Sequence, residues 1–299
     1  MTIRADQAPP SDQPIRLTPK LVLAAGLEIA AAAALAALVI REPEPPAAAG
    51  HVHSGMTGMH SEVASSIHWS FADLALGGLA VGALIWLATT RTRTSAGLAA
   101  AAAAAFAASA PVRALAATSH LVAMAALEVL AVAAPLLLIA AAHRATPASP
   151  DRTIRRYSMA VITATAGYSA LLIALHLPGM HDRAGRLGSI PLWLAPVIAA
   201  VGIAYWGAIL GTAGRVRTSV RRRALVIGQE VGAILGLAAI IRPTATMEHV
   251  SPLGISAQLD HRLGGVLMLA TCAAVTLPLL KRLAPQHDEA GSGAGSGVG

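Results

Sequence analysis

Long apolar runs alternate with short polar breaks along this chain of 299 residues. A helix needs roughly 20 mostly apolar residues to cross a bilayer. The pattern predicts eight membrane-spanning helices, at residues 21–40, 69–90, 95–112, 118–142, 157–177, 190–212, 225–242 and 259–280. The first run is longer than the apolar part of a secretory signal peptide, so we expect a retained helix. The predicted fold is all-α, a polytopic integral membrane helix bundle.

Composition agrees with a membrane protein and excludes a soluble globule. Hydrophobic residues make up 55% of the chain and charged residues only 12%, with a mean hydropathy of +0.63. Soluble domains carry about a quarter charged residues. The single cysteine, Cys272, excludes an intramolecular disulfide and a cysteine-only metal cluster.

Positive charges indicate the orientation of the predicted bundle. With both termini on the cytoplasmic side, most of the 22 Lys and Arg residues fall on that side, as the positive-inside rule requires. This side holds Arg4, Arg16, Lys20, Arg91, Arg93, Arg144, Arg152, Arg155, Arg156, Arg215, Arg217, Arg221, Arg222, Arg223, Lys281 and Arg282. The net charge of +7 therefore reflects membrane topology, and we expect contact with membrane lipid but no nucleic-acid partner.

The same topology divides the chain into three parts. Residues 1–20 form a cytoplasmic tail, 21–280 form the bundle, and 281–299 form a flexible, Gly/Ser-rich cytoplasmic tail. An outer loop, 41–68, joins the first two helices and contains the stretch HVHSGMTGMH.

Histidine and methionine gather on the predicted outer side, opposite the arginines. The outer loop contributes His51, His53, Met56, Met59 and His60. Imidazole together with thioether suits copper, and methionine favours Cu(I). Because a Gly-containing loop has no rigid scaffold, we expect it to capture copper rather than to form the main site. The alternative interpretation is a solvated linker with incidental histidines.

Helix-borne residues predict a better-defined metal site. His120 and Met124 lie one turn apart on one helix face, and His261 and Met268 share a face of the last helix. His176 ends the fifth span. We expect these five residues to bind Cu(I) at a common depth. Taken singly, each is also explained as a helix-end histidine reaching the membrane interface or as a methionine that fills a gap in the core.

Several acidic residues fall within or beside the predicted spans. Glu28, Glu128 and Glu230 are intramembrane carboxylates, which are costly and point to function by default. Glu230 lies toward the cytoplasmic side, where the neighbouring Gln229 is a possible hydrogen-bond partner. Asp73 is either an acid in the first turn of its helix or a partner for an imidazole.

Three motifs, in order, resemble the CtaG-type cytochrome c oxidase assembly factors over roughly residues 65–280. They are SHLVAM with APLLL (Ser119–Met124, Ala134–Leu138), HLPGMHD (His176–Asp182) and LDHRLGGVLM (Leu259–Met268). Met124 stands where the family often has a second histidine, His261 stands where it has glutamine, and IPLWLAP (Ile190–Pro196) lacks the family's histidine motif. The resemblance implies a polytopic bacterial membrane protein linked to copper supply for haem–copper oxidases.

These observations favour a non-enzymatic copper-handling factor in the bacterial cytoplasmic membrane. Its partner would be a haem–copper oxidase subunit or another cuproprotein. A second hypothesis is a haem-binding redox protein resembling haem A synthase, with His68, His120, His176 and His261 as ligands. Copper import along Glu28, Glu128 and Glu230, and an accessory subunit of a respiratory complex, are further alternatives. No nucleophile triad, P-loop or dinucleotide fingerprint occurs in the sequence.

Overall fold

The computed structural model describes residues 68–142, 154–177, 189–241 and 253–283. Its regular elements over these residues are all helical, which confirms the predicted fold class. In chain order they are α2 (Phe71–Thr90), α3 (Arg93–Ala107), α4 (Ala110–Thr118), α5 (His120–Glu128), the π-helical segment η1 (Val129–Ala133), α6 (Ala134–Ala142), α7 (Ile154–Leu175), α9 (Leu194–Gly211), α10 (Thr218–Ile241) and α11 (Ala257–Arg282).

Six of these helical runs are long and apolar enough to cross a membrane, or seven if the bent pair α3 and α4 forms one span. α5, η1 and α6 make one continuous run, from His120 to Ala142. The predicted first helix, 21–40, and most of the outer loop lie outside the described residues, as do the N-terminal tail, 1–20, and the C-terminal tail from residue 284; Lys281 and Arg282 of the predicted tail belong to α11. The described part of the chain is therefore a multi-span membrane bundle.

The predicted straight span at 95–112 is instead broken near the histidine-containing end of the bundle. α3 stops at Ala107, and α4 continues at an angle of 57° to it. Pro111 lies in the first turn of α4, where its missing N–H costs nothing. In a continuous helix the same proline would remove a hydrogen bond and clash with the preceding turn, so the chain bends here.

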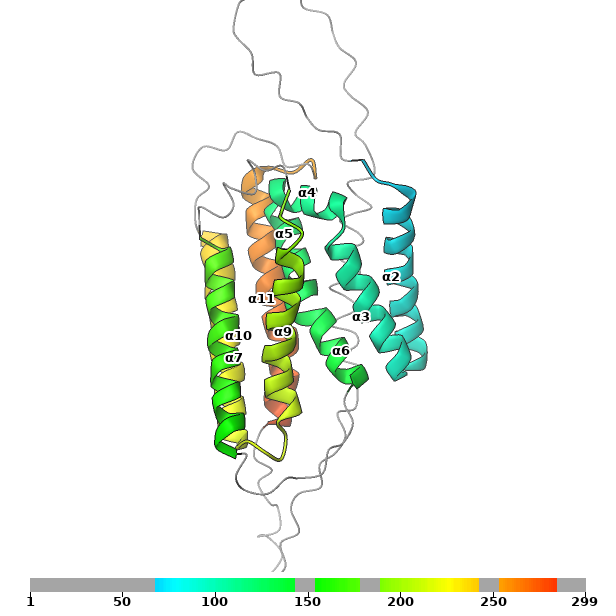
Figure 1. Cartoon of the computed structure of the whole chain (residues 1–299). Helices are drawn as coiled ribbons and strands as arrows, with labels where there is room; N and C mark the ends of the chain where they lie inside the picture. The colour runs from blue at the N-terminus through cyan, green and yellow to red at the C-terminus, as the bar shows by residue number, and fades with distance from the viewer. Residues whose placement is uncertain (1–67, 143–153, 178–188, 242–252, 284–299) are drawn as a thin grey trace, which may run out of the picture.

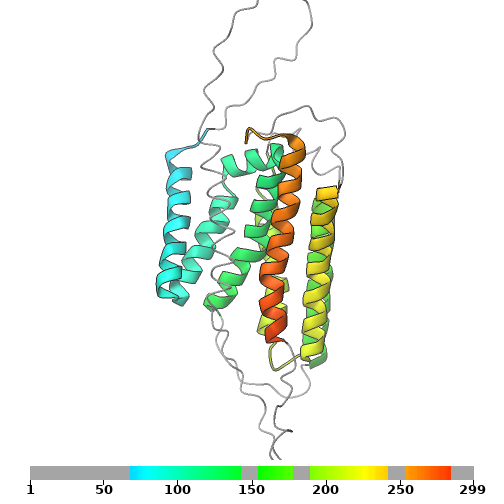
Figure 2. The same cartoon turned by 180° about the vertical axis from the view of Figure 1, so that it is seen from behind.

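The helices stand side by side in an elongated bundle (Figure 1). α7 and α10 form one edge, α5, α9 and α11 form the centre, and α2 and α3 form the opposite edge, as the reverse view also shows (Figure 2). α5 and α11 both begin at the same end, which we call the histidine end because they open with His120 and with Asp260–His261. We call the opposite end, where α10 begins near Arg221, the arginine end.

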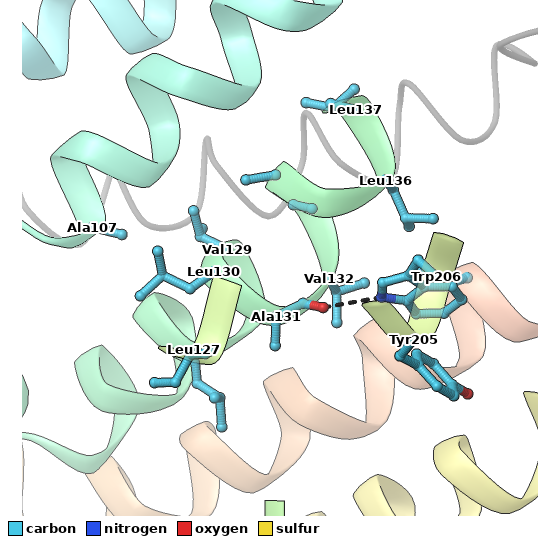
Figure 3. Close-up of a cluster of buried hydrophobic side chains, with 14 of the residues drawn as sticks. Ala107, Leu127, Val129, Leu130, Ala131, Val132, Leu136, Leu137, Tyr205 and Trp206 are labelled. Carbon is cyan, nitrogen blue, oxygen red and sulfur yellow. Dashed lines mark hydrogen bonds between the residues drawn. The ribbon is translucent and has the colours of Figure 1, made fainter. Parts of the chain in front are cut away.

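A π-helical segment interrupts the central span where Pro135 follows it. Proline has no N–H, so it cannot donate to the carbonyl of Ala131 four residues earlier. Trp206 of α9 supplies the missing donor: its Nε1–H donates to the Ala131 carbonyl at 3.0 Å (Figure 3). Gly202, one turn from Trp206, lets the two backbones approach, since a Cβ there would lie 2.5 Å from the same oxygen. The break in the helix is thus stabilised by its neighbour.

Close glycine contacts also join α10 to α11. A Cβ on Gly265 would lie 2.5 Å from the Gly236 carbonyl oxygen and 2.9 Å from Cγ1 of Ile240. Small residues allow such backbone approach in membranes, where helix association depends on packing rather than on the hydrophobic effect. This contact sets the position of α11, and therefore of the residues at its histidine end.

We expect Gly265→Ala to destabilise the bundle by about 1–3 kcal/mol, because the added methyl group meets backbone atoms that cannot move aside. Thermal unfolding of the purified protein in detergent measures the change. Gly207→Ala on α9 is the matched control, since a Cβ at Gly207 meets no atom within 4 Å. Equal unfolding temperatures for the two variants would contradict the proposed packing.

Candidate metal site at the histidine end

Three histidines that are far apart in the sequence converge at the histidine end. His120 begins α5, His261 lies in the first turns of α11, and His176 follows the last residue of α7. The ring centroids of His120 and His261 are 4.0 Å apart, with the planes tilted by 36°. His176 approaches His120 edge-on, at 6.5 Å between centroids. The structure therefore brings together the three helix-borne histidines that the sequence singled out.

Asp260 ties the two central helices together directly beside these rings. One of its carboxylate oxygens accepts a hydrogen bond from the Ser119 hydroxyl at 2.6 Å, and the other accepts from the backbone N–H of His120, also at 2.6 Å. Asp260 is only 4% exposed. A carboxylate at the N-termini of two helices is also favoured by both helix dipoles. Asp260 thus fixes the start of α5 against α11 and holds His120 opposite His261.

A backbone carbonyl orients the third histidine. Nδ1 of His176 lies 2.8 Å from the carbonyl oxygen of Leu172. A carbonyl oxygen can only accept, so Nδ1 must carry the proton in this bond. In the neutral ring the lone pair is then on Nε2, and metal-binding histidines are commonly oriented through such a bond from the other ring nitrogen.

Met124 accompanies His120 on the face of α5 that meets α11. A Cβ on Gly264 would lie 2.7 Å from Cδ2 of His120 and 3.2 Å from Cγ of Met124. Both side chains therefore pack on the same glycine of α11, and Met124 is fully enclosed. This places a thioether one turn below an imidazole, as the sequence predicted.

Met268 occupies a different place. It lies seven residues after His261, or ~10 Å along the helix axis, and the end of its side chain approaches Gly232 of α10. Its position supports packing between α10 and α11, at a distance from the paired rings of His120 and His261. The remaining predicted ligands, His51, His53, Met56, Met59 and His60, lie outside the described residues.

The carboxylates separate into different environments. Glu128 is buried and interacts electrostatically with Tyr168 of α7, whose ring stacks on Tyr205 of α9 at 4.1 Å. The Tyr205 hydroxyl donates to the backbone carbonyls of Ala224 and Leu225, at 3.4 Å and 3.3 Å, and the buried Gln229 side chain lies close to both tyrosines. This polar layer begins two turns of α5, or ~12 Å, below His120. Gln229 therefore faces the tyrosines, and its suggested pairing with Glu230 is wrong: Glu230 points out of the bundle.

Two residues near the start of α2 belong to helix capping and to the surface. Asp73 accepts hydrogen bonds from the backbone N–H and the hydroxyl of Ser70, at 3.1 Å and 2.6 Å. Asp73 and Ser70 form a capping box at the start of α2. Of the two roles predicted for Asp73, the structure therefore shows an acid in the first turn of its helix, not a partner for an imidazole of the described residues. His68 is exposed and precedes α2, a helix that packs mainly on α3.

Sequence reasoning did not identify Ser119 and Asp260 as parts of the site. The sequence signal that could have identified them is their position next to the histidines: a serine directly precedes His120, and an aspartate directly precedes His261. Serine before a helix predicts an N-cap, and the Ser119 hydroxyl does accept from the Val122 N–H at 3.3 Å. Its second bond, to a residue 141 positions away, follows only from the packing of α5 on α11.

Chemically, the arrangement offers nitrogen donors from partly exposed histidines and a sulfur donor from the buried Met124. Within the described ranges, no three side chains of the types His, Cys, Asp and Glu lie close enough together to hold one metal ion. The nearest donors are the paired rings of His120 and His261, with the thioether of Met124 one turn away. Two imidazoles and a thioether suit a soft ion of low coordination number such as Cu(I), and suit hard, oxygen-seeking cations poorly.

Comparison with known proteins places the chain in a family. The profile of the cytochrome c oxidase caa3 assembly factors (Caa3_CtaG) matches residues 82–286, which include every helix from α3 to α11 and all of the histidine-end residues described above. No curated protein and no solved structure matches the chain. The matched region covers more than half of the sequence, and the chain therefore belongs to the cytochrome c oxidase caa3 assembly factor family.

Proposed function

We propose that this protein receives Cu(I) at the histidine end and passes it, as cargo, to a haem–copper oxidase subunit during assembly. The observation that carries the proposal is the contact between His120 and His261, whose ring centroids are 4.0 Å apart on two helices tied by Asp260. Membership of the assembly-factor family supports the oxidase as recipient. In this proposal the protein is a binding factor rather than an enzyme.

Each part of the site has a distinct role in the proposed transfer. His120 and His261 are the primary ligands, and Met124 supplies a soft third donor from below. His176, reaching toward His120 from α7, is suited to receive or release the ion at the edge of the site. A site at the end of the bundle, rather than in its centre, leaves the ion within reach of a docked partner. We place this end at the outer face of the bacterial cytoplasmic membrane, in accordance with the distribution of arginines.

The geometry does not favour the haem alternative. Rings with centroids 4.0 Å apart are in direct contact, so no porphyrin plane fits between His120 and His261. His68 lies on the surface at the start of α2. A haem protein would show a Soret band after purification, and a colourless preparation agrees with the copper proposal.

The test uses the full chain, purified anaerobically in detergent and loaded with Cu(I). We expect copper to remain bound through desalting and to appear in a copper-free oxidase on mixing, as measured by metal analysis of the separated proteins. Retention without transfer would contradict delivery. Uptake of copper by proteoliposomes, lost in Glu128→Ala, would indicate transport across the membrane instead.

Deletion of residues 51–60 tests the expected role of the outer loop. We expect slower copper acquisition at low copper concentration and an unchanged unfolding temperature, because the sequence predicts a Gly-containing loop that adds ligands without a rigid scaffold. Stopped-flow competition with a Cu(I) chelator measures the rate. A large loss of thermal stability would show instead that the segment is structural.

A further inference from the structure

One face of α10 carries an acidic side chain among exposed apolar ones. Ile227, Ile234, Leu237 and Ile241 follow each other at helical spacing and are 52%, 66%, 49% and 69% exposed. Glu230 lies among them, also exposed, between Ile227 and Ile234. We call these five residues the Glu230 stripe. Gln229, the residue directly before Glu230, is buried and faces Tyr168 and Tyr205 inside the bundle.

Glu230 is unusual among the acids of the described helices. The other three in the described ranges, Asp73, Glu128 and Asp260, are wholly or partly covered and bonded within the protein. Glu230 is the one that is exposed, and no hydrogen bond or ion pair of the described residues involves it.

The position of Glu230 along α10 is within the membrane-spanning part of the helix. It follows Arg223 by seven residues, or ~10 Å, and precedes Ile241 by eleven, or ~16 Å. The residues between Arg223 and Ile241 are otherwise uncharged. Hydrocarbon cannot donate a hydrogen bond, and intramembrane carboxylates almost always face a protein interior, a water-filled cavity or a partner. We therefore expect a carboxylate on the outer surface of a spanning helix to meet a hydrogen-bond donor, which another helix can supply.

We propose that the Glu230 stripe is the docking surface for a transmembrane helix of the oxidase under assembly. The docked helix presents a hydrogen-bond donor, from Lys, Arg, His, Asn or Gln, at the depth of Glu230, and small or apolar residues against the isoleucines on either side. Charge complementarity selects this occupant. A second copy of the chain, packed symmetrically through α10, would bring two Glu230 carboxylates together with only apolar neighbours from the stripe.

The inference rests on the oxidase-assembly family and is independent of copper binding. Two surfaces of the protein then have separate roles: the histidine end would bind Cu(I), and the exposed side of α10 would bind the oxidase subunit that receives it. α10 packs on α11 through Gly236 and Gly265, so the docking surface and His261 are carried by neighbouring helices. A bound oxidase helix would thus lie beside the helix that supplies one copper ligand.

Photo-crosslinking in native membranes tests the proposed contact. The photoreactive residue p-benzoylphenylalanine is placed at Ile234 of the full chain, in cells that make a tagged oxidase. The control has the same residue at Ile162, which is 55% exposed on α7. We expect a crosslink from position 234 to a tagged oxidase subunit, and at least tenfold less from position 162. Equal yields from both positions, or a crosslink between two copies of the chain, would overturn the proposal.

Substitution of the carboxylate gives a second, independent measurement. In the same crosslinking assay, we expect Glu230→Leu to reduce the oxidase adduct at least tenfold, and Glu230→Gln to keep an intermediate yield because an amide oxygen still accepts a hydrogen bond. Cu(I) binding by both purified variants should equal that of the unmodified protein. An unchanged adduct in Glu230→Leu would refute the docking surface, whereas a failure of the copper proposal would leave these crosslinks intact.

Discussion

His120→Ala and His261→Ala are each expected to weaken Cu(I) binding at least 100-fold, equivalent to ~2.7 kcal/mol. The two rings are in direct contact, with centroids 4.0 Å apart, and are the proposed primary ligands. Removing either one breaks the primary pair, and the remaining imidazole, the thioether of Met124 and the more distant His176 are too few and too scattered for tight retention. Anaerobic competition with a chromogenic Cu(I) chelator measures the affinity.

His68→Ala is the control for these variants. His68 is exposed at the start of α2, and we expect its replacement to leave the affinity of the helix site unchanged. The double variant His120→Ala/His261→Ala should be little worse than either single variant, because the two rings act as one site. Retention of full affinity in both single variants would place the copper elsewhere and remove the basis of the proposed function.

Asp260→Ala is expected to lower both stability and copper affinity. The variant leaves the Ser119 hydroxyl and the His120 N–H without their acceptor in a buried place, which costs about 2–5 kcal/mol in all. The start of α5 is then no longer held against α11, and loss of such a positioning group typically weakens metal binding 10–100-fold. Thermal unfolding and the same chelator competition measure the two effects.

Asp260→Asn separates hydrogen bonding from charge. An amide of the same shape still accepts from the His120 N–H and can donate to the Ser119 oxygen, so we expect most of the stability to return. Copper affinity should recover in parallel if Asp260 acts by positioning His120. If Asp260→Asn restores stability but leaves affinity as low as in Asp260→Ala, the carboxylate acts through its charge rather than through the position of the ring.

The helices were largely predictable from the sequence, although α10 begins at Thr218, seven residues before the predicted span 225–242. Apolar runs predicted the span from His120 to Ala142 to within two residues, since length and hydropathy are local properties. The histidines of three helices were expected at one depth, because each lies at the end of its span, and the structure brings them together. The sequence did not predict the bend between α3 and α4 or the π-helical segment. Their proline residues were visible, but only the neighbouring helices decide whether a proline bends, breaks or is tolerated.

The direction in which a residue faces was less predictable. Glu128 and Glu230 look alike in the sequence, each a single acid in an apolar run, yet one lies inside the bundle and the other outside. The hydropathy pattern around them is nearly uniform, so periodicity does not show which face of the helix is buried. In water, the polar face of a helix indicates its exposed side; in lipid, both faces are apolar and this indication is lost.

The sequence by itself thus determined the membrane class, the described helical segments, the family motifs and which three histidines lie at one end of the bundle. Only the tertiary structure decided that His120 meets His261 while Met268 packs toward α10, that Asp260 joins α5 to α11, and that Glu230 faces outward. The physical reason is that spans form from local hydrophobicity and backbone hydrogen bonding, whereas the rotation and neighbours of each helix depend on close contacts such as those of Gly264 and Gly265, which join residues far apart in the chain.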